Sequence, residues 1–170
     1  MRKLEIIPIR CSETLREVLL KDFKSIGKEL PIKGGWGYSK EDAIIIDKND
    51  PAAVNWQPFN GVAMEYLIAE KRVFEELIIF RKKDDQFRQI RRVWNRQELH
   101  WGEGGKKYDV IKYHINAFHD VDFNAIDAEV QERIMKEENF DFVKFFESKN
   151  DLRYEYEAEF WFEISSFMNA

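Results

Sequence analysis

Histidine and aspartate residues past the middle of the chain have the types that metal-assisted hydrolysis needs. His119-Asp120 is followed by Asp122, and the other histidines are His100 and His114. Imidazole nitrogens and carboxylate oxygens are common ligands of zinc and related metals. No second histidine lies at a spacing that clearly completes a ligand set, and an aspartate here also suits the start of a helix. A metal-assisted hydrolase using His119, Asp120 and one distant histidine is therefore an alternative, and the preferred interpretation includes no cofactor.

Cys11 is the other candidate for chemistry, as a nucleophile. It precedes a predicted helix, whose N-terminus can lower the pKa of a thiol. The sequence ties no histidine or other base to this residue, and an isolated cysteine is commonly a small buried hydrophobe. With no complete catalytic constellation in view, the sequence favours a binding role over an enzymatic one.

The C-terminal stretch 152–164 carries the most regular pattern in the chain. Apolar residues occupy every second position, namely Leu152, Tyr154, Tyr156, Ala158, Phe160, Phe162 and Ile164. Because side chains on a strand alternate between its two faces, the pattern predicts one long, central strand with a buried aromatic face. The residues of the opposite face are Arg153, Glu155, Glu157, Glu159, Trp161 and Glu163.

Carboxylates spaced this closely repel one another, so a neighbour is expected to offset their charge. The simpler interpretation is that the strand containing Arg88, Arg92 and Arg96 lies beside the last strand and forms exposed ion pairs with it. The functional alternative is a docking surface for a cationic protein, with Trp161 as its central anchor. The partner-binding residues would then be Glu155, Glu157, Glu159, Trp161 and Glu163.

A glycine-rich loop supplies Trp36 and Tyr38 as further candidates for partner binding. They belong to Gly34-Gly35-Trp36-Gly37-Tyr38, inside a predicted loop over 29–42. The segment lacks the Lys-Ser/Thr ending of a phosphate-binding loop and the spacing of a dinucleotide fingerprint. Turn formation explains its glycines, whereas aromatic residues on a loop are suited to recognition.

Basic residues are concentrated in the segment 81–96. It holds Arg81, Lys82, Lys83, Arg88, Arg91, Arg92 and Arg96 against Asp84 and Asp85. Arginines interleaved with Phe87 and Trp94 could bind phosphates and stack on bases, so a nucleic-acid-binding domain through Arg81–Arg96 is a second alternative. The net charge of -5 opposes it, and a salt-bridged sheet explains the arginines more simply.

Length and composition suit a single globular domain over residues 1–170. The chain is 44% hydrophobic and 35% charged, which is typical of a protein with a real core. Cys11 is the only cysteine, so no internal disulfide can form and a cytoplasmic location is expected. Neither a signal-peptide pattern nor an apolar run long enough for a bilayer is found, so no membrane contact is expected.

Hydrophobic periodicity and turn residues predict the elements that position these groups. Strands are expected over Lys3–Arg10, Ala43–Ile46 and 152–164, with a hairpin of Phe87–Trp101 and Lys106–Phe118 around Gly102–Gly105. Helices are expected over Ser12–Ile26, Val62–Phe80, Phe123–Glu137 and Phe140–Phe146. Helices and antiparallel strands without regular strand–helix–strand alternation favour an α+β fold, with an antiparallel sheet and helices mainly on one face.

Together these features predict a non-catalytic protein-binding module. One concrete version is an immunity-type inhibitor that neutralises a basic toxin or nuclease domain. Such an inhibitor benefits from an acidic surface, because complementary charge speeds the encounter with a cationic enzyme. The sequence identifies neither the partner nor the oligomeric state.

Overall fold

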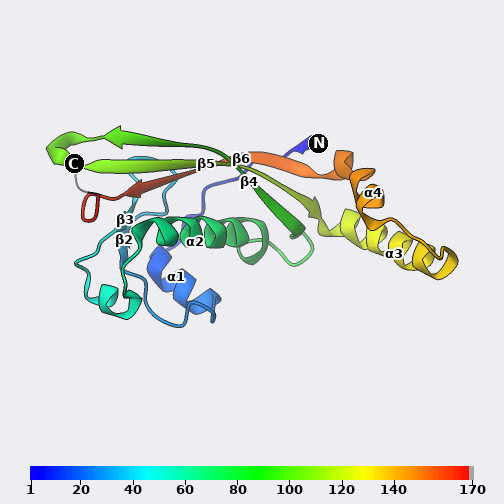
Figure 1. The fold of residues 1–170 in the computed structure, drawn as a ribbon, viewed down its shortest axis with the longest axis horizontal. Helices are drawn as coiled ribbons and strands as arrows, with labels where there is room; N and C mark the ends of the chain where they lie inside the picture. The colour runs from blue at the N-terminus through cyan, green and yellow to red at the C-terminus, as the bar shows by residue number, and fades with distance from the viewer. Residues whose placement is uncertain (169–170) are drawn as a thin grey trace.

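The computed structural model describes residues 1–168, which form one six-stranded sheet with helices below it and at one end (Figure 1). The strands are β1 (Arg2–Lys3), β2 (Ile32–Gly34), β3 (Ile44–Ile46), β4 (Phe87–Trp101), β5 (Lys107–His119) and β6 (Tyr154–Glu163). The α-helices are α1 (Leu15–Asp22), α2 (Gly61–Phe74), α3 (Asp120–Lys136) and α4 (Phe142–Glu147). Shorter helical turns are η1 (Pro51–Trp56), η2 (Glu75–Ile79), η3 (Glu103–Gly105) and η4 (Asn150–Leu152).

The C-terminal strand β6 is central, as its alternating pattern predicts. The sheet order is β2-β3-β6-β5-β4, and β1 joins β6 at its start. Phe160, Phe162 and Ile164 are fully buried on one side of this strand. Removing a side chain of that size from water is worth about 1.5–3 kcal/mol, which explains why the sheet is built around this segment.

The α+β class is confirmed, but the sheet is mixed and not antiparallel throughout. β6 pairs antiparallel with β5, whereas it runs parallel to β1 and to β3. Neither β1 nor β3 is joined to β6 by a hairpin, and a long connection allows parallel pairing. The expectation of an antiparallel sheet was wrong because hydrophobic periodicity describes one strand at a time and does not specify the direction of its neighbours.

Helices α1 and α2 cover one face of the sheet (Figure 1). Residues of α1 and α2 pack into the same core as the sheet residues Ile111, Ile115 and Phe160; the helical members are Leu15, Val18, Leu19, Met64, Ile68, Ala69 and Val73. The helical prediction for Val62–Phe80 is confirmed by α2, which continues into the π-helical turn η2. The first helix is shorter than expected, because the capping box starts at Thr14 and not at Ser12.

The predicted hairpin is confirmed as β4 and β5. β4 is the outermost strand, and bulges between Arg88 and Arg91 and between Trp94 and Arg96 interrupt its register with β5. Gln89, inside the first bulge, has a φ of 49°, in the left-handed region that residues other than glycine rarely adopt. Such bulges re-aim side chains, so sequence spacing alone does not give the face of each β4 residue.

Helices α3 and α4 pack together at the far end of the sheet (Figure 1). Their core is a separate apolar cluster of Phe118, Ile126, Val130 and Phe145. Phe118 comes from the end of β5, so the cluster attaches this pair of helices to the strands. The molecule therefore has a large core between the sheet and helices α1 and α2, and a small one around α3 and α4.

Short segments near the N-terminus depart from the predictions. The strand expected over Lys3–Arg10 is limited to β1. The Leu4 amide still donates to the Glu155 carbonyl, after which the chain turns away and the Ile9 amide donates to Tyr38. Conversely, the predicted loop contains the strand β2. Gly34 ends β2 with a φ of 85°, where a Cβ would lie 2.6 Å from the Ala43 carbonyl oxygen, so this turn requires glycine.

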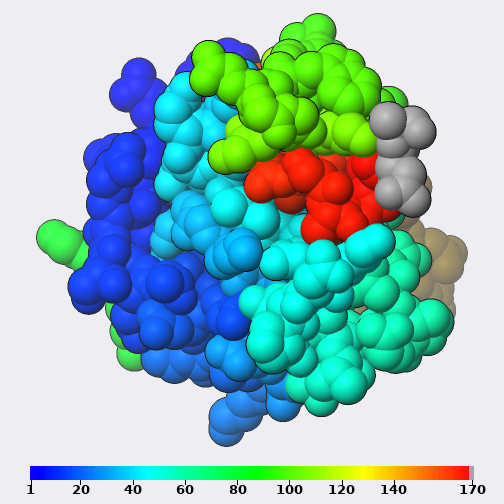
Figure 2. Space-filling model, turned by 90° about the vertical axis from the view of Figure 1, so that its left-hand side faces the viewer, coloured from blue at the N-terminus to red at the C-terminus, as the bar shows by residue number. Residues whose placement is uncertain are grey.

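The segment that follows β6 closes the opposite end of the molecule. Figure 2 shows it in red between the hairpin tip, in green, and the cyan chain around η1. The Ser165 hydroxyl accepts from the Lys107 amide at 2.9 Å, and the Ser166 hydroxyl donates to the Ile46 carbonyl at 3.0 Å. Among residues 1–168, no helix combines the length and the apolar character needed to cross a membrane.

Candidate functional site

The face of β4, β5 and β6 that points away from α1 and α2 is called the outer face here. Its alternating positions on β6 are Glu155, Glu157, Glu159, Trp161 and Glu163, and those opposite them on β5 are Asn116, His114, Lys112, Val110 and Tyr108. The two-sided pattern predicted for β6 is therefore present, with the aromatic side in the core and the glutamates on the other side. No helix covers the middle of the outer face (Figure 1).

Trp161 is half-buried among aromatic neighbours on the outer face. Its ring centroid lies 5.2 Å from that of His100 and 6.1 Å from that of Tyr108. The indole nitrogen donates to Glu159, one alternate position along the same strand. These contacts hold the indole in place and leave part of its ring accessible, as a preorganised contact residue requires.

The glutamates of the outer face have neighbours that partly neutralise them. Lys3 lies 2.8 Å from Glu155, and Lys112 lies 3.3 Å from Glu159. The hydrogen bond from the Lys3 ammonium holds the pKa of the Glu155 carboxyl below its ordinary value. The positive charges expected beside the β6 glutamates are therefore present, but lysines supply them and not the expected arginines.

His114 sits between two carboxylates of β6. Its Nε2 atom is 3.1 Å from Glu155, and its Nδ1 atom is 2.8 Å from Glu157. The Glu157 side chain remains 62% exposed, and within residues 1–168 no lysine or arginine pairs with it. Glu157 is consequently the least compensated carboxylate in the middle of the strand.

The expected pairing of the arginine-bearing strand with β6 is wrong, because β5 lies between them. The arginines of β4 are also divided between the two faces by its bulges. Arg96 pairs with Glu98 at 3.1 Å, whereas Arg92 points toward α2 and lies 3.6 Å from Glu70. Register across three strands depends on long-range packing, which local spacing does not encode.

Trp36 and Tyr38 lie inside the molecule rather than on an exposed loop. Trp36 is only 7% exposed and packs edge-on against Phe80. The Tyr38 hydroxyl donates to Glu76 at 3.1 Å and accepts from the Ile9 amide at 3.2 Å. Burial, and then the nearby Glu76 carboxylate, raise the pKa of Tyr38. Neither side chain is free to meet a partner in this conformation.

The interior network around Tyr38 is centred on Arg72 of α2. The guanidinium donates to Glu76 at 2.8 Å, to the Trp36 carbonyl at 3.0 Å and to the Glu159 carbonyl at 2.7 Å. It also lies between the rings of Tyr38 and Phe160, 4.2 and 3.8 Å from their centroids. All three nitrogens have partners, so this cluster links α2 to β6 and to the loop.

The candidate metal residues do not converge. His119 caps α3, since its Nδ1 atom accepts from the Val121 amide at 3.3 Å, and its Nε2 atom lies 3.0 Å from Asp85. Asp120 is paired with Arg88 at 2.8 Å. His100 and His114 do not meet across the hairpin, because they lie opposite Tyr108 and Val93. Residues 1–168 contain no group of three His, Cys, Asp or Glu side chains that could hold a metal ion.

The basic segment does not form a single surface either. Arg81 donates to Asp85 at 3.0 Å and to the Glu76 carbonyl, while Phe87 is buried. Trp94 is exposed, but on the face of β4 that points toward α2. Stacking and phosphate contacts need aromatic and basic side chains on one groove, and here they are separated.

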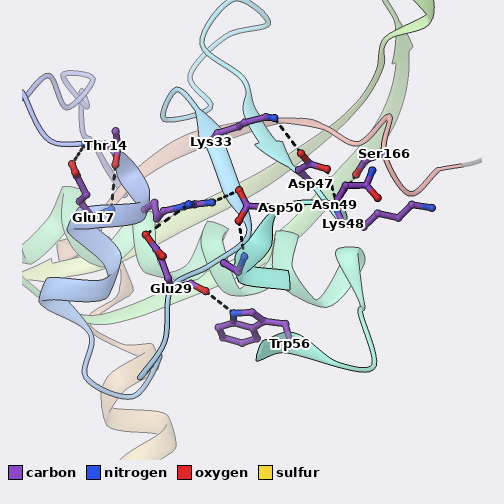
Figure 3. A network of polar contacts seen from close by, with 12 residues as sticks. Thr14, Glu17, Glu29, Lys33, Asp47, Lys48, Asn49, Asp50, Trp56 and Ser166 are labelled. Atoms are coloured by element: carbon purple, nitrogen blue, oxygen red, sulfur yellow. Dashed lines mark hydrogen bonds and ion pairs between the residues drawn. The ribbon is translucent and has the colours of Figure 1, made fainter. Parts of the chain in front are cut away.

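A polar cluster joins α1, β2 and η1 beside a cavity of about 350 Å³ (Figure 3). Arg16 lies 2.6 Å from Asp50 and 3.7 Å from Glu29, and Lys33 lies 3.1 Å from Asp47. Asp50 also caps η1 by accepting from the Ala52 amide. Because Arg16 and Lys33 already have carboxylate partners, the cluster is best explained as a link between the elements.

The sequence interpretation missed the β5 residues of the outer face. Tyr108, Lys112 and His114 complete the surroundings of the β6 glutamates and of Trp161. Their signal was the alternation within the second arm of the hairpin, which becomes informative once that arm is known to neighbour β6.

Comparisons with known proteins give no further guide to function. The chain matches no protein-family model, no curated protein and no solved structure.

Proposed function

We propose that this chain is a non-catalytic protein-binding module that docks its outer face against a cationic protein surface. One observation carries the proposal. Along the middle of β6, in the part of the chain that the structure describes, carboxylates flank a partly accessible indole that no helix covers. A rigid aromatic residue surrounded by polar side chains is the usual arrangement of an interface hot spot.

The charge balance of the outer face supports a cationic partner. Lys3, Arg96 and Lys112 offset Glu155, Glu98 and Glu159. Glu157 and Glu163 have no such partner within residues 1–168, and Glu163 accepts only from the Ser165 amide. These two carboxylates lie on either side of Trp161 along β6, where they can attract lysines and arginines of another protein. Glu157 also contacts His114, and Arg91 lies nearer the α4 end of the face.

An immunity-type inhibitor of a basic toxin or nuclease domain is the concrete form of this proposal. Inhibitors of this kind gain speed from complementary fields, and the net charge of -5 has the required sign. The proposal places the chain in the cytoplasm, where the exposed free thiol of Cys11 would stay reduced.

A pull-down from the native host tests the proposal. The bait proteins are the unaltered chain, Glu157→Lys and Glu132→Lys, with bound proteins identified by mass spectrometry. Glu132 is a matched control, because its side chain is 65% exposed on α3, away from the outer face. We expect a basic protein to be recovered with the unaltered chain and with Glu132→Lys, and to be lost with Glu157→Lys.

Kinetics with the recovered protein then locate the contact. The association rate should fall steeply as salt rises, since steering is screened over about 8 Å at physiological ionic strength. Trp161→Ala should weaken binding by about 2 kcal/mol or more, which is roughly 30-fold. Equal recovery with both lysine variants, or an association rate independent of salt, would show that the outer face is not the docking surface.

A further inference from the structure

The strongest unassigned feature lies between α4 and the first bulge of β4. A cavity of about 360 Å³ opens there, with Gln89, Arg91 and Asn150 on its polar side. Phe142, Val143 and Phe146 supply its apolar lining, and the lining also includes Glu147. The volume is at the lower end of the range for ligand pockets, so it suits a small molecule.

Arg153, the residue before β6, is buried next to Gln89 of the cavity wall. It is 0% exposed, and its Nη1 atom donates to the carbonyl of Gln89 at 3.0 Å and to Asn116 Oδ1 at 3.1 Å. Its guanidinium carbon lies 4.0 Å from the centroid of the Phe118 ring. The bond to Gln89 connects this buried side chain directly to the wall of the cavity and to the left-handed residue in the bulge.

The guanidinium of Arg153 is not satisfied. Its Nε and Nη2 atoms are buried without a hydrogen-bond partner, and so is Oδ1 of Asn150, a residue of the cavity lining. A buried donor without a partner has lost its hydrogen bonds to water and gained none in return, which destabilises the fold, and more so when the group is charged. Native proteins rarely keep such groups unless something outside the chain completes them.

The positive charge at this site also lacks a counter-ion. Within residues 1–168, no carboxylate oxygen comes within salt-bridge distance of Arg91 or Arg153. Burial, and then the neighbouring charge of Arg91, lower the pKa of Arg153 to about 10, so the Arg153 guanidinium remains cationic at neutral pH. Two uncompensated guanidinium groups beside an apolar wall define the charge and the polarity of what would fit.

We propose that this cavity binds a small organic anion, in which a carboxylate or phosphate group contacts Arg91, with the buried charge of Arg153 nearby, and an apolar part contacts Phe142, Val143 and Phe146. Guanidinium groups bind both kinds of oxyanion through paired hydrogen bonds. Arg91, which is exposed on the lining, makes the direct contact, and Arg153 supplies a fixed buried charge beneath it. The inference stands apart from the proposed protein contact, since it uses different residues.

Titration followed by two-dimensional NMR tests the site, with the arginine Nε–H signals as the readout. The probes are two aromatic anions, 3-phenylpropionate and phenyl phosphate. Inorganic phosphate is the control that lacks the apolar group, and the neutral 3-phenylpropanamide is the control that lacks the charge. We expect one or both aromatic anions to shift the Arg91 and Arg153 signals with millimolar or better affinity. The tighter of the two identifies the preferred head group. Each of the incomplete probes should bind at least 10-fold more weakly.

Matched variants separate this site from general charge attraction. Arg91→Met should weaken binding of the better anion at least 10-fold, whereas Arg92→Met, the next residue on the opposite face of β4, should leave it unchanged. Val143→Asp, at a position that is 69% exposed, should weaken binding at least 10-fold, because it replaces an apolar contact with a second carboxylate beside Glu147. The proposal is overturned if no probe shifts either arginine, if the amide binds as well as the anions, or if Arg91→Met and Arg92→Met behave alike.

Discussion

Arg72 of α2 meets the middle of β6, Arg153 immediately precedes β6, and each residue is almost wholly removed from water, with exposed fractions of 1% and 0%. Under α2, every nitrogen of Arg72 has a partner, including the Glu76 carboxylate. At the α4 end, Arg153 has partners at one nitrogen only and no carboxylate. The first region is therefore fully hydrogen-bonded within the chain, whereas the second leaves two buried donors unpaired beside the proposed anion site.

A third buried ionisable group shows why the contrast is informative. Glu65 of α2 is 0% exposed beside Asp109 of β5, and Gln97 donates to Asp109. Burial, and then the interaction with Asp109, raise the pKa of Glu65 to about 9, so this carboxyl is neutral at pH 7. A carboxyl can lose its charge by taking up a proton, whereas a guanidinium cannot at neutral pH. Arg153 therefore depends on a counter-ion in a way that Glu65 does not.

Replacing Arg72 should have the largest effect. Arg72→Met leaves Glu76 buried with only the hydroxyls of Tyr38 and Tyr156 as donors. Breaking a buried ion pair by removing one partner typically costs about 3–5 kcal/mol. Urea denaturation should show a loss of that size with an unchanged m-value. A loss below about 1 kcal/mol would mean that the contacts of Arg72 with Glu76 and the two carbonyl groups do not stabilise the fold.

The next largest effect is expected in the pH dependence of the free energy of unfolding, through Glu65. Because the folded protein retains a proton on Glu65 that the unfolded chain releases above its ordinary pKa of 4.5, the free energy of unfolding should fall as pH rises from about 4.5 to about 9. Glu75, whose pKa burial also raises to about 9, contributes in the same direction.

Urea titrations at pH 5 and pH 9 measure this effect. Glu65→Gln, which imitates the protonated form, should reduce the loss between the two pH values by on the order of 2–3 kcal/mol. Exposed Glu132→Gln serves as the control and should leave the loss unchanged. If the curves for Glu65→Gln and for the unaltered chain run parallel, Glu65 does not carry the proton.

Replacing Arg153 should have a smaller effect than replacing Arg72. Arg153→Met leaves the Gln89 carbonyl and Asn116 unpaired, but it also removes a buried, uncompensated charge. These contributions oppose each other, so the free energy of unfolding should change by no more than about 1 kcal/mol. A loss as large as that of Arg72→Met would show that Arg153 stabilises the fold as much as Arg72 does, which contradicts the difference inferred between the two residues.

The smallest effect is expected at the rim of the α4 cavity. Val143→Asp alters a mostly exposed side chain and should change stability by less than about 0.5 kcal/mol. Thermal unfolding of this variant should therefore coincide with that of the unaltered chain within about 2 °C. Agreement would show that any loss of anion binding by Val143→Asp is local, and a large shift would point to a packing role for α4.

Elements with a strong local pattern could be predicted from the sequence. The hairpin of β4 and β5 follows from alternating strands around a glycine-rich link, and α2 follows from apolar residues at helical spacing. The β1 and β2 predictions failed because both strands are very short and gain their pairing from distant partners. Only a few residues define each of them, so their sequence carries almost no periodic signal.

The candidate site could be predicted only in part. The glutamate row and Trp161 were recognised from period-two alternation, which is local. Trp36 and Tyr38 look like loop residues in the sequence, yet a buried Arg72 from α2 draws the loop into the core. The Arg91–Arg153 cluster could not be found, since the register shift in β4 and the position of α4 bring these residues together.

The sequence by itself determined that segment 152–164 has one apolar and one acidic face, because alternation of side chains is a property of any extended chain. Only the tertiary structure decided which residues oppose that acidic face and which buried charges find a partner. Both depend on strand order, strand direction and helix placement, which are set by contacts between residues far apart in the chain. Such contacts are chosen by the packing of the whole core, and no local spacing records them.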